Sequence, residues 1–288
     1  MKKLLAIALT MVMAAGVIAG CAKEEVKEEV KEEVSQDTAT EAATDAAEEK
    51  TSDRTTFTVG FDAEFPPYGY MDDNGEYVGF DLSLAAEVCK RNNWTLVKQP
   101  IDWDSKDMEL SSGAIDCIWN GFTINGREDQ YTWTIPYVDN SQVFVVKTDA
   151  GIKALTDLAD KTVGVQKDSS ALAALEGDAK DLADTFKELI QYADYNTAFM
   201  DLEAGAVDAV AIDIGVASYQ IAQRGDGYVM LDENLATEQY AVGFLKGNDE
   251  LKNEVEKTLL EMVEDGTFSK IAAEYADYGL VDAVCLGK

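Results

Sequence analysis

An internal repeat constrains the fold of this chain more than any other feature of its sequence. Residues 110–118 run Leu-Ser-Ser-Gly-Ala-Ile-Asp-Cys-Ile, and residues 202–210 repeat the pattern as Leu-Glu-Ala-Gly-Ala-Val-Asp-Ala-Val. In each copy a helical stretch ends at a glycine, Gly113 or Gly205, and leads directly into an apolar run that is typical of a buried strand. The sequence therefore predicts the same helix–glycine–strand unit twice.

A second repeat gives the order of the elements in each half. Thr-Val-Gly occurs at residues 58–60 and again at residues 162–164, each time in a stretch that favours a strand. Each half thus runs strand, helix and then the helix–glycine–strand unit. Alternating strands and helices form parallel sheets that are covered by helices on both faces. We therefore expect an α/β fold with two similar lobes.

The intervening segments fit this plan. After Gly79, the apolar residues of the segment 80–89 recur at helical spacing. In the second half, the pattern predicts two helices and two flanking strands, the helices at 171–175 and 182–189 and the strands at 142–147 and 240–246.

The two flanking strands carry the chain into the second lobe and out of it again. This assigns residues 55–139 and 240–288 to lobe 1 and residues 140–239 to lobe 2. Residues 253–278 have apolar side chains at helical spacing, and we expect them to return and cover lobe 1. Two crossings between lobes form a two-segment hinge.

The N-terminus predicts export. Lys2 and Lys3 precede an apolar run over residues 4–18, which is too short to span a membrane as a helix. The run closes with Ile-Ala-Gly-Cys, which resembles the lipobox of bacterial lipoproteins. The resemblance implies that residues 1–20 are a signal peptide and that Cys21 is lipidated. A plain secretory signal is the alternative.

The segment that follows has no pattern that would form a core. Residues 21–54 contain Lys-Glu-Glu-Val three times and then Thr, Ala, Asp and Glu without a period. We expect an acidic, disordered tether that holds the protein at the extracytoplasmic face of the cell membrane.

Composition excludes several classes of function. The chain has no histidine, which removes the usual general base and most zinc sites. Its formal net charge of −31 would repel nucleic acid. Beyond Cys21, the cysteines Cys89, Cys117 and Cys285 are scattered, which is typical neither of a disulfide framework nor of a metal site. We expect no metal ion, no other cofactor and no enzymatic activity.

Candidate binding residues lie just past the ends of the predicted strands, the edge at which open α/β sheets bind ligands. They are Asp62, Phe65, Asn120, Gly121, Thr123, Arg127, Ser169, Ser170 and Asp213. One fixed cation, carboxylates and hydroxyl groups together complement a zwitterion. The planar fork of Arg127 suits a carboxylate. The alternative is a surface arginine paired with Glu128 or Asp129.

From about residue 55 to the C-terminus, the chain resembles the amino-acid-binding family of extracytoplasmic solute-binding proteins that feed ABC importers. The resemblance lies in six phrases that occur in the family's order: Val-Gly-Phe-Asp-Ala-Glu-Phe-Pro-Pro-Tyr (59–68), Gly-Phe-Asp-Leu (79–82), Asp-Cys-Ile-Trp-Asn-Gly-Phe-Thr-Ile (116–124), Val-Gly-Val-Gln (163–166), Ala-Val-Asp-Ala-Val (206–210) and Glu-Asp-Gly-Thr-Phe-Ser-Lys-Ile (264–271). It implies a type-II periplasmic-binding-protein fold, with the ligand between closing lobes.

The resemblance also implies roles for the candidate residues. Arg127 and the backbone N–H of Thr123 would bind the α-carboxylate of an amino acid. Asp213 would take its α-ammonium, together with the Thr123 hydroxyl and the Gly121 carbonyl. Ser169 and Ser170 match a pair that contacts the carboxylate, at a point where a helix begins and N–H groups favour an anion.

Asp62 and Phe65 match an acid and an aromatic residue that line the side-chain pocket. Arg127 departs from the family pattern, since it follows Thr123 by four residues rather than five. The positive φ open to Gly126 would allow the tighter turn that this spacing needs.

Other interpretations of single residues remain open. Asp213 precedes an expected helix at 214–223 and is alternatively its N-cap. Phe65 is alternatively an ordinary core residue. Asp116 and Asp208, inside the repeat, are expected to be structural.

The expected protein is a lipid-anchored receptor of an ABC importer. It would capture a free polar amino acid and deliver it to a membrane permease, and a monomer is expected. Asp62, Glu64 and Asp102 would suit a cationic side chain. The alternatives are a sensory binding module and a periplasmic dehydratase-like enzyme that uses Asp62 or Glu64 as proton donor.

Overall fold

The computed structural model describes residues 54–288, which belong to one compact unit. The predicted signal peptide, the lipidation site at Cys21 and the predicted tether up to residue 53 lie outside the described residues. In the part of the chain that is described, no helix is both long enough and apolar enough to cross a membrane.

Two sheets organise the described residues. The first has the order β5-β1-β6-β14-β7, formed by Thr95–Pro100, Thr56–Phe61, Cys117–Ile118, Gly243–Leu245 and Tyr131–Trp133. The second has the order β10-β9-β11-β8-β12, formed by Glu188–Tyr192, Thr162–Gln166, Ala209–Asp213, Val138–Lys147 and Tyr228–Met230, and β13 (Ala236–Tyr240) also pairs with β8. A small third sheet consists of β2 (Glu64–Phe65), β3 (Gly69–Met71) and β4 (Tyr77–Val78).

The helices fall between these strands, as an α/β fold requires. The α-helices are α1 (Phe80–Arg91), α2 (Lys106–Ser112), α3 (Ser170–Glu176), α4 (Lys180–Ala183), α5 (Tyr195–Ala204), α6 (Ile214–Arg224), α7 (Asp249–Glu264), α8 (Thr267–Ala273) and α9 (Leu280–Ala283). Short 3₁₀ helices cover Trp103–Ser105 (η1), Leu155–Leu158 (η2) and Ala276–Tyr278 (η3).

The predicted helix–glycine–strand unit is present twice. Helix α2 ends at Gly113 (φ 78°) before β6, and α5 ends at Gly205 (φ 77°) before β11. A left-handed residue at this position favours glycine, because a Cβ would be strained there.

The two aspartates of the repeat make matching contacts. Asp116 Oδ2 accepts a hydrogen bond from the Thr58 backbone N–H at 2.7 Å, and Asp208 Oδ2 accepts one from the Thr162 N–H at 2.9 Å. Each aspartate thus ties the strand of its unit to the strand that carries the Thr-Val-Gly repeat, which is the expected structural role.

Both sheets are mixed, whereas the sequence predicted parallel ones. The central strands agree with the prediction, since β1 is parallel to β5 and β6, and β9 is parallel to β10 and β11. Strands β14, β8, β12 and β13 are antiparallel to their neighbours. Each of them comes after a repeated unit, and β8 and β13 connect the two lobes, so the alternation rule does not govern them.

Three predicted elements differ from the structure. The helix expected at 182–189 is replaced by the short α4 and by β10, which pairs with β9 along its whole length. The strand expected at 240–246 is divided between the end of β13 and β14. Pairing with distant strands overrides the local pattern at both places.

The strand that the repeat predicts after Gly113 is reduced to the two residues of β6. Backbone bonds to β1 nevertheless continue on both sides of it, from Asp116 N–H to Thr58 O (2.8 Å) and from Trp119 N–H to Gly60 O (3.2 Å). The difference therefore concerns the ends of the element and not its place in the sheet.

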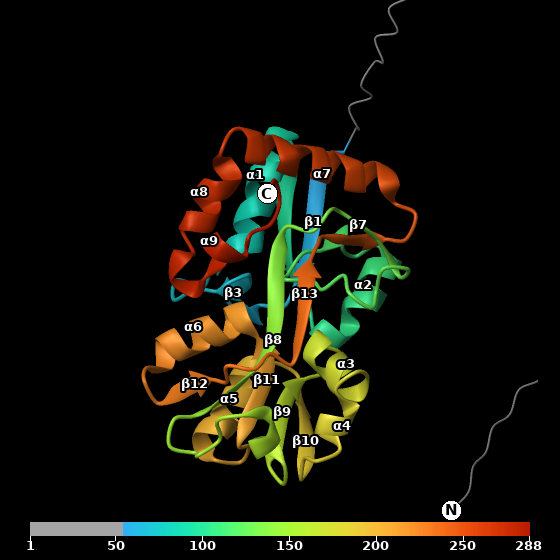
Figure 1. The fold of residues 1–288 in the computed structure, drawn as a ribbon. Coiled ribbons are helices and arrows are strands. Elements are labelled where there is room, and N and C mark those ends of the chain that lie inside the picture. Colours follow the sequence, from blue (N-terminus) through green and yellow to red (C-terminus); the bar gives the residue numbers. More distant parts are fainter. Residues whose placement is uncertain (1–53) are drawn as a thin grey trace, which may run out of the picture. The chain divides into compact units, whose positions relative to one another are not determined.

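Strands β8 and β13 lie side by side and lead from one lobe to the other, as Figure 1 shows. They pair in antiparallel register from Val138–Tyr240 to Gln142–Ala236. Residues on this hinge therefore lie between the two lobes, close to the ends of β6 and β11.

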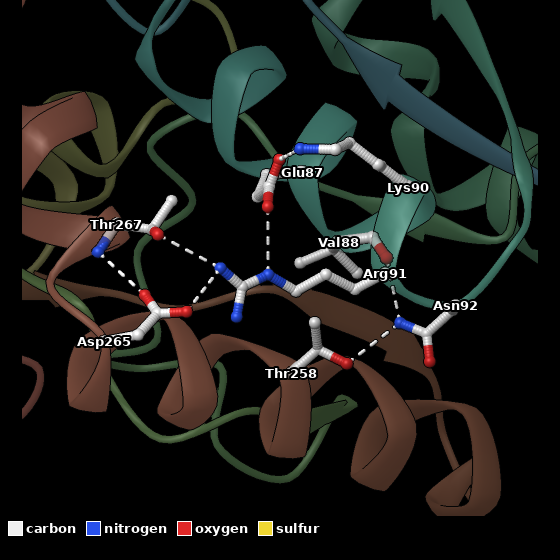
Figure 2. A network of polar contacts seen from close by, with 8 residues as sticks. All are labelled: Glu87, Val88, Lys90, Arg91, Asn92, Thr258, Asp265 and Thr267. Carbon is white, nitrogen blue, oxygen red and sulfur yellow. Dashed lines mark hydrogen bonds and ion pairs between the residues drawn. The ribbon is translucent and has the colours of Figure 1, made fainter.

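The C-terminal helices cover lobe 1, as expected, and a polar network fixes them to α1 (Figure 2). Arg91, the last residue of α1, bonds Glu87 at 3.0 Å and reaches Asp265 at 2.8 Å and Thr267 at 3.0 Å beyond the end of α7. Asn92 Nδ2 donates to Thr258 Oγ1 on α7 at 2.8 Å.

The cysteines of the described residues are free thiols. Cys89 and Cys117 are buried in the core, and Cys285 is partly exposed. Burial raises the pKa of Cys89 to about 12, so its side chain is a neutral, small apolar group.

Candidate functional site

A pocket lies where the ends of β6, β9 and β11 face one another across the hinge. It is lined by Phe65, Trp103, Asn120, Gly121, Thr123, Arg127, Gln166, Ser169, Ser170 and Asp213. Eight of the nine predicted binding residues are in this set, and the ninth, Asp62, bonds to Gln166. The pocket volume is about 10 Å³, which is at the lower limit for one water molecule.

Arg127 is placed by a tight turn in the loop after β6. Its N–H bonds Ile124 O at 2.9 Å, and Gly126 in the turn has φ 78°. The guanidinium donates to the backbone oxygens of Thr123 and Asp168, each at 3.3 Å. Among residues 54–288, no carboxylate lies within ion-pair distance of it, so the alternative pairing with Glu128 or Asp129 is not formed.

A buried carboxylate holds the start of this loop. Asp81 Oδ2 on α1 accepts bonds from the Gly121 N–H at 2.6 Å and from the Tyr137 hydroxyl at 2.8 Å. Asp81 is fully buried, and burial raises its pKa to about 7. Asp81 lies in the Gly-Phe-Asp-Leu phrase of the family resemblance, but the sequence did not predict a role for it.

Two further contacts fix the loop. Asn120 Oδ1 accepts a bond from the Asp62 N–H at 2.9 Å. Gly121 has φ 56°, and a Cβ there would meet the rings of Phe65 and Tyr240 at 3.0 Å. Glycine is therefore required at position 121 by both conformation and space.

Asp213 contributes a buried carboxylate from the end of β11. Its Oδ1 accepts bonds from Asn140 Nδ2 at 2.9 Å and Gln142 Nε2 at 2.6 Å, and also from the Tyr240 hydroxyl. Although Asp213 occupies the N-cap position of α6, its side chain makes no capping bond. The alternative role of its side chain as a helix cap is therefore not the one that the structure shows.

Burial, and then the nearby charge of Glu238, raise the pKa of Asp213 to about 7. Glu238 lies on β13 and is only 7% exposed. Its Oε1 accepts bonds from the Thr123 hydroxyl at 3.0 Å and from the amides of Asn140 and Gln142 at 2.7 Å each. Sequence reasoning missed Glu238, since nothing in the pattern around it separates it from other acids of the chain.

Ser169 and Ser170 make different contacts. Ser169 Oγ accepts a bond from the Leu172 N–H at 3.1 Å and is the N-cap of α3. The Ser170 hydroxyl lies across the hinge from Thr123, at 3.2 Å from its Oγ1, and 2.9 Å from Gln142 Nε2.

One end of the pocket is acidic. Asp62 Oδ2 accepts a bond from Gln166 Nε2 at 2.7 Å, and burial raises the pKa of Asp62 to about 6. Phe65 packs on Tyr68 and Tyr195, with ring centroids 5.7 and 6.0 Å apart, and lines the pocket as well. It is thus both a core residue and a wall of the pocket.

A second cavity of about 400 Å³ continues from this end, and Trp103 lines both. No lysine or arginine of the described part of the chain lines the second cavity. Its carboxylates are those of Asp62, Glu64, Asp102, Glu109 and Asp194. Two other tryptophans lie elsewhere: Trp119 is buried in the core, and Trp133 packs on Phe122.

Comparison with known proteins gives a consistent picture. Residues 57–278 match the family model of bacterial extracellular solute-binding proteins, family 3. The L-cystine-binding protein TcyJ of Escherichia coli strain K12 is 27% identical over 223 residues, which cover 76% of this chain and 82% of TcyJ.

Solved structures agree with the family model. An ABC uptake transporter substrate-binding protein from Streptococcus pneumoniae with bound histidine is 35% identical, with a TM-score of 0.74 over 76% of this chain and 92% of that one. The ancestral amino-acid-binding protein AncCDT-1, a precursor of cyclohexadienyl dehydratase, is 30% identical, with a TM-score of 0.69 over 76% and 95% of the two chains.

The two α/β lobes and the two-stranded hinge are those of the type-II periplasmic-binding-protein fold, as the sequence predicted. The match to the family model spans most of the chain, and it agrees with the six phrases that first suggested the resemblance. The chain belongs to the bacterial extracellular solute-binding proteins of family 3.

Proposed function

We propose that the protein is a lipid-anchored receptor that captures a polar amino acid between its two lobes and delivers it to a membrane permease. The observation that carries this proposal is the placement of Arg127 and Asp213. They line the same pocket, and they come from different lobes. A fixed cation and a buried carboxylate on opposite sides match the carboxylate and the ammonium of a zwitterion.

Closure follows from the cost of burying charge. An ion taken out of water without a partner loses several kcal/mol, and a well-placed opposite charge offsets that loss. An amino acid held by Arg127 alone leaves its ammonium without a partner, and one held by Asp213 alone leaves its carboxylate unpaired. The ligand therefore favours the closed arrangement, in which both ends are paired.

The present volume of the pocket requires movement before capture. With about 10 Å³, it has no room for an amino acid. Contacts from Thr123 to Ser170 and from Asp62 to Gln166 join the lobes directly. These contacts separate when the lobes move apart about β8 and β13, and the ligand then enters from the side of the cleft.

Among polar amino acids, a cationic side chain fits the acidic end best. Asp62 is buried beside the pocket, and the cavity beyond Trp103 carries five carboxylates. A positive side chain that passes Trp103 would lie among them and offset their mutual repulsion. Histidine and cystine, the ligands named for two relatives, are polar as well.

The proposal places the protein at the outer face of the membrane, held through lipid on Cys21, as a monomer that works with an ABC permease. Membership of an extracellular solute-binding family supports the location. Fatty-acid labelling of cells tests the anchor, and a Cys21→Ser protein that still carries label contradicts it. Uptake of the ligand that persists after removal of the permease contradicts import.

A thermal-shift screen tests the ligand class. The twenty amino acids and cystine are each added to purified protein, and calorimetry follows for those that raise the melting temperature. We expect arginine, lysine or histidine to give the largest shift and glutamate and aspartate none. A largest shift with an acidic or aliphatic amino acid contradicts the proposed specificity.

The similarity to AncCDT-1 favours a second test, because that protein is described as the precursor of a dehydratase. The bound ligand is recovered after long incubation and analysed by NMR. The proposal predicts unchanged amino acid. A dehydrated product would instead support an enzyme with Asp62 or Glu64 as proton donor.

A further inference from the structure

We propose that Glu238 on the hinge strand β13 is a second carboxylate of the ammonium subsite. With Asp213 it makes that subsite selective for ligands that bring both a positive charge and several N–H donors. This inference rests on the proposed function, since Glu238 contacts Thr123 and Ser170, which line the same pocket.

The position of Glu238 is the first argument. Its Oε1 lies 3.0 Å from the Thr123 hydroxyl of lobe 1 and 3.2 Å from the Ser170 hydroxyl of lobe 2, and both residues line the pocket. One carboxylate oxygen on the hinge thus contacts a pocket residue from each lobe. A ligand group placed between Thr123 and Ser170 comes within reach of Glu238.

A second observation is that the two carboxylates bind the amide N–H groups of Asn140 and Gln142. Asn140 Nδ2 and Gln142 Nε2 each bond to both Asp213 Oδ1 and Glu238 Oε1. Gln142 Nε2 also lies 2.9 Å from the Ser170 hydroxyl, so three oxygens share its two hydrogens.

The amide oxygens of the same two residues, Asn140 Oδ1 and Gln142 Oε1, are buried and have no hydrogen-bond partner among the described residues. Asn140 is 5% exposed and Gln142 is fully buried. A cluster of buried acceptors that is short of donors is unfavourable, and a primary ammonium supplies three N–H donors and a charge.

No cation among residues 54–288 faces this cluster closely enough to replace the ligand. Arg127 lines the pocket, but its guanidinium bonds the backbone oxygens of Thr123 and Asp168. The remaining titratable groups that face Asp213 from neighbouring elements are hydroxyl groups, those of Tyr68, Tyr195 and Tyr240. Burial raises the pKa of each tyrosine well above its ordinary value, so all three are neutral.

The carboxylate of Asp213 shares its buried donors with the carboxylate of Glu238. Burial and the charge of Glu238 raise the pKa of Asp213 to about 7, so without ligand this group holds a proton over much of the range below pH 7. An ammonium bound beside both groups lowers that pKa, and the proton leaves to solvent. Ligand affinity should then rise about tenfold per pH unit up to about pH 7 and level off above it.

Calorimetric titration tests the inference. The probes are L-arginine and L-glutamine, whose side chains do not titrate between pH 5 and 8. Wild-type protein, Glu238→Gln and the matched control Glu233→Gln are titrated at pH 5.5, 6.5 and 8.0. Glu233 is exposed, outside the pocket, and its substitution makes the same change in net charge.

We expect wild type and Glu233→Gln to bind about 30-fold more tightly at pH 8.0 than at pH 5.5. Glu238→Gln should bind about tenfold more weakly than wild type at pH 8.0 and should vary less with pH than wild type does, because only burial then raises the pKa of Asp213. Glu238→Gln with the affinity and the pH profile of wild type overturns the inference and leaves the proposed function standing.

A second measurement uses wild type alone, in case the variant does not fold. Titration at pH 6.5 in two buffers of different ionisation enthalpy counts the protons that are released on binding. We expect a clear release, and binding without proton release overturns the inference. Wild type that binds none of the amino acids of the thermal-shift screen overturns the proposed function and this inference with it.

Discussion

The two lobes share one framework and differ where each framework ends. In both, a helix stops at a left-handed glycine, a short buried strand follows, and an aspartate just before that strand binds the backbone of the strand with the Thr-Val-Gly repeat. After β6 the chain forms an irregular loop that ends in Arg127. After β11 it continues without a break into α6, with Asp213 at the junction.

The same supporting unit therefore presents a cation from one lobe and a carboxylate from the other. A loop suits the first task, because backbone N–H and carbonyl groups and the guanidinium can all reach the pocket. A strand end suits the second, because a buried carboxylate needs neighbours that donate, and the hinge strands supply Asn140 and Gln142. The repeat provides rigidity, and the difference between the copies provides recognition.

Substitution of Arg127 or Asp213 should have the largest effect on ligand affinity, because each lobe contributes one of these charges. Arg127→Ala and Asp213→Ala are each expected to weaken amino-acid binding by about 100-fold or more, because loss of one partner leaves a buried ligand charge unpaired, at about 3–5 kcal/mol. Calorimetry measures the loss, and circular dichroism checks that each variant is folded. Near-normal affinity in either variant contradicts the pairing of poles with lobes.

Substitution of the repeated aspartates should lower stability in both lobes alike and leave the binding site unchanged. Asp116→Ala and Asp208→Ala each lose a charged hydrogen bond to a strand N–H. We expect each to lower the free energy of unfolding by about 1.5–3 kcal/mol in urea denaturation. Ligand affinity of the folded protein should change little. A stability loss confined to one variant contradicts the equivalence of the two units.

The buried carboxylates of both lobes should make the stability of the protein depend on pH. Asp81 and Asp213 have pKa values of about 7, above the ordinary 3.8. The native state thus binds more protons than the unfolded state between these values, and stability falls as pH rises through that range. We expect Asp81→Asn to reduce this fall between pH 5 and pH 8 by about 1–2 kcal/mol, measured by urea denaturation.

Ligand binding supplies the contrast between these two residues. The amide of Asp81→Asn retains an oxygen that accepts the Gly121 and Tyr137 bonds, so the variant should still bind ligand. Asp213→Asn removes the charge that pairs with the ammonium and should not bind. Equal loss of binding in both variants contradicts the distinction between a residue that supports the loop and one that contacts the ligand.

The smallest expected effects concern the last residue of one helix in each lobe. Arg91 ends α1 and joins the C-terminal helices to lobe 1, whereas Arg224 ends α6 in lobe 2 and lies 4.9 Å from the centre of the Phe199 ring (Figure 2 shows Arg91). Arg91→Ala should lower the free energy of unfolding by about 1 kcal/mol and Arg224→Ala by about 0.5 kcal/mol. Binding affinity should be unchanged in both, and a change contradicts their purely structural role.

Local signals allowed much of this fold to be predicted. Gly113 and Gly205 each end a helix by a rule that needs only neighbouring residues, and the repeated Asp116 and Asp208 follow from the same unit. The failure at β10 has the opposite cause. Glu188–Tyr192 is a strand because β9 pairs with it, and that pairing is not visible in the residues themselves.

The candidate site shows the same limit. Arg127 and Asp213 were predicted because each follows a recognisable strand. Glu238 was missed because its partners, Thr123 and Asn140, are 115 and 98 residues away in the sequence. A buried acceptor cluster of this kind is formed only when the hinge strands bring both lobes together.

The central claim is that each lobe holds one pole of the ligand, and half-ligands test it most directly. Wild-type protein is titrated with L-arginine and with two analogues, the decarboxylated amine agmatine and the deaminated 5-guanidinopentanoic acid. The account predicts that each analogue binds at least about 100-fold more weakly than arginine, because one pole of the closed site is left unpaired. Either analogue binding within about tenfold of arginine would contradict it.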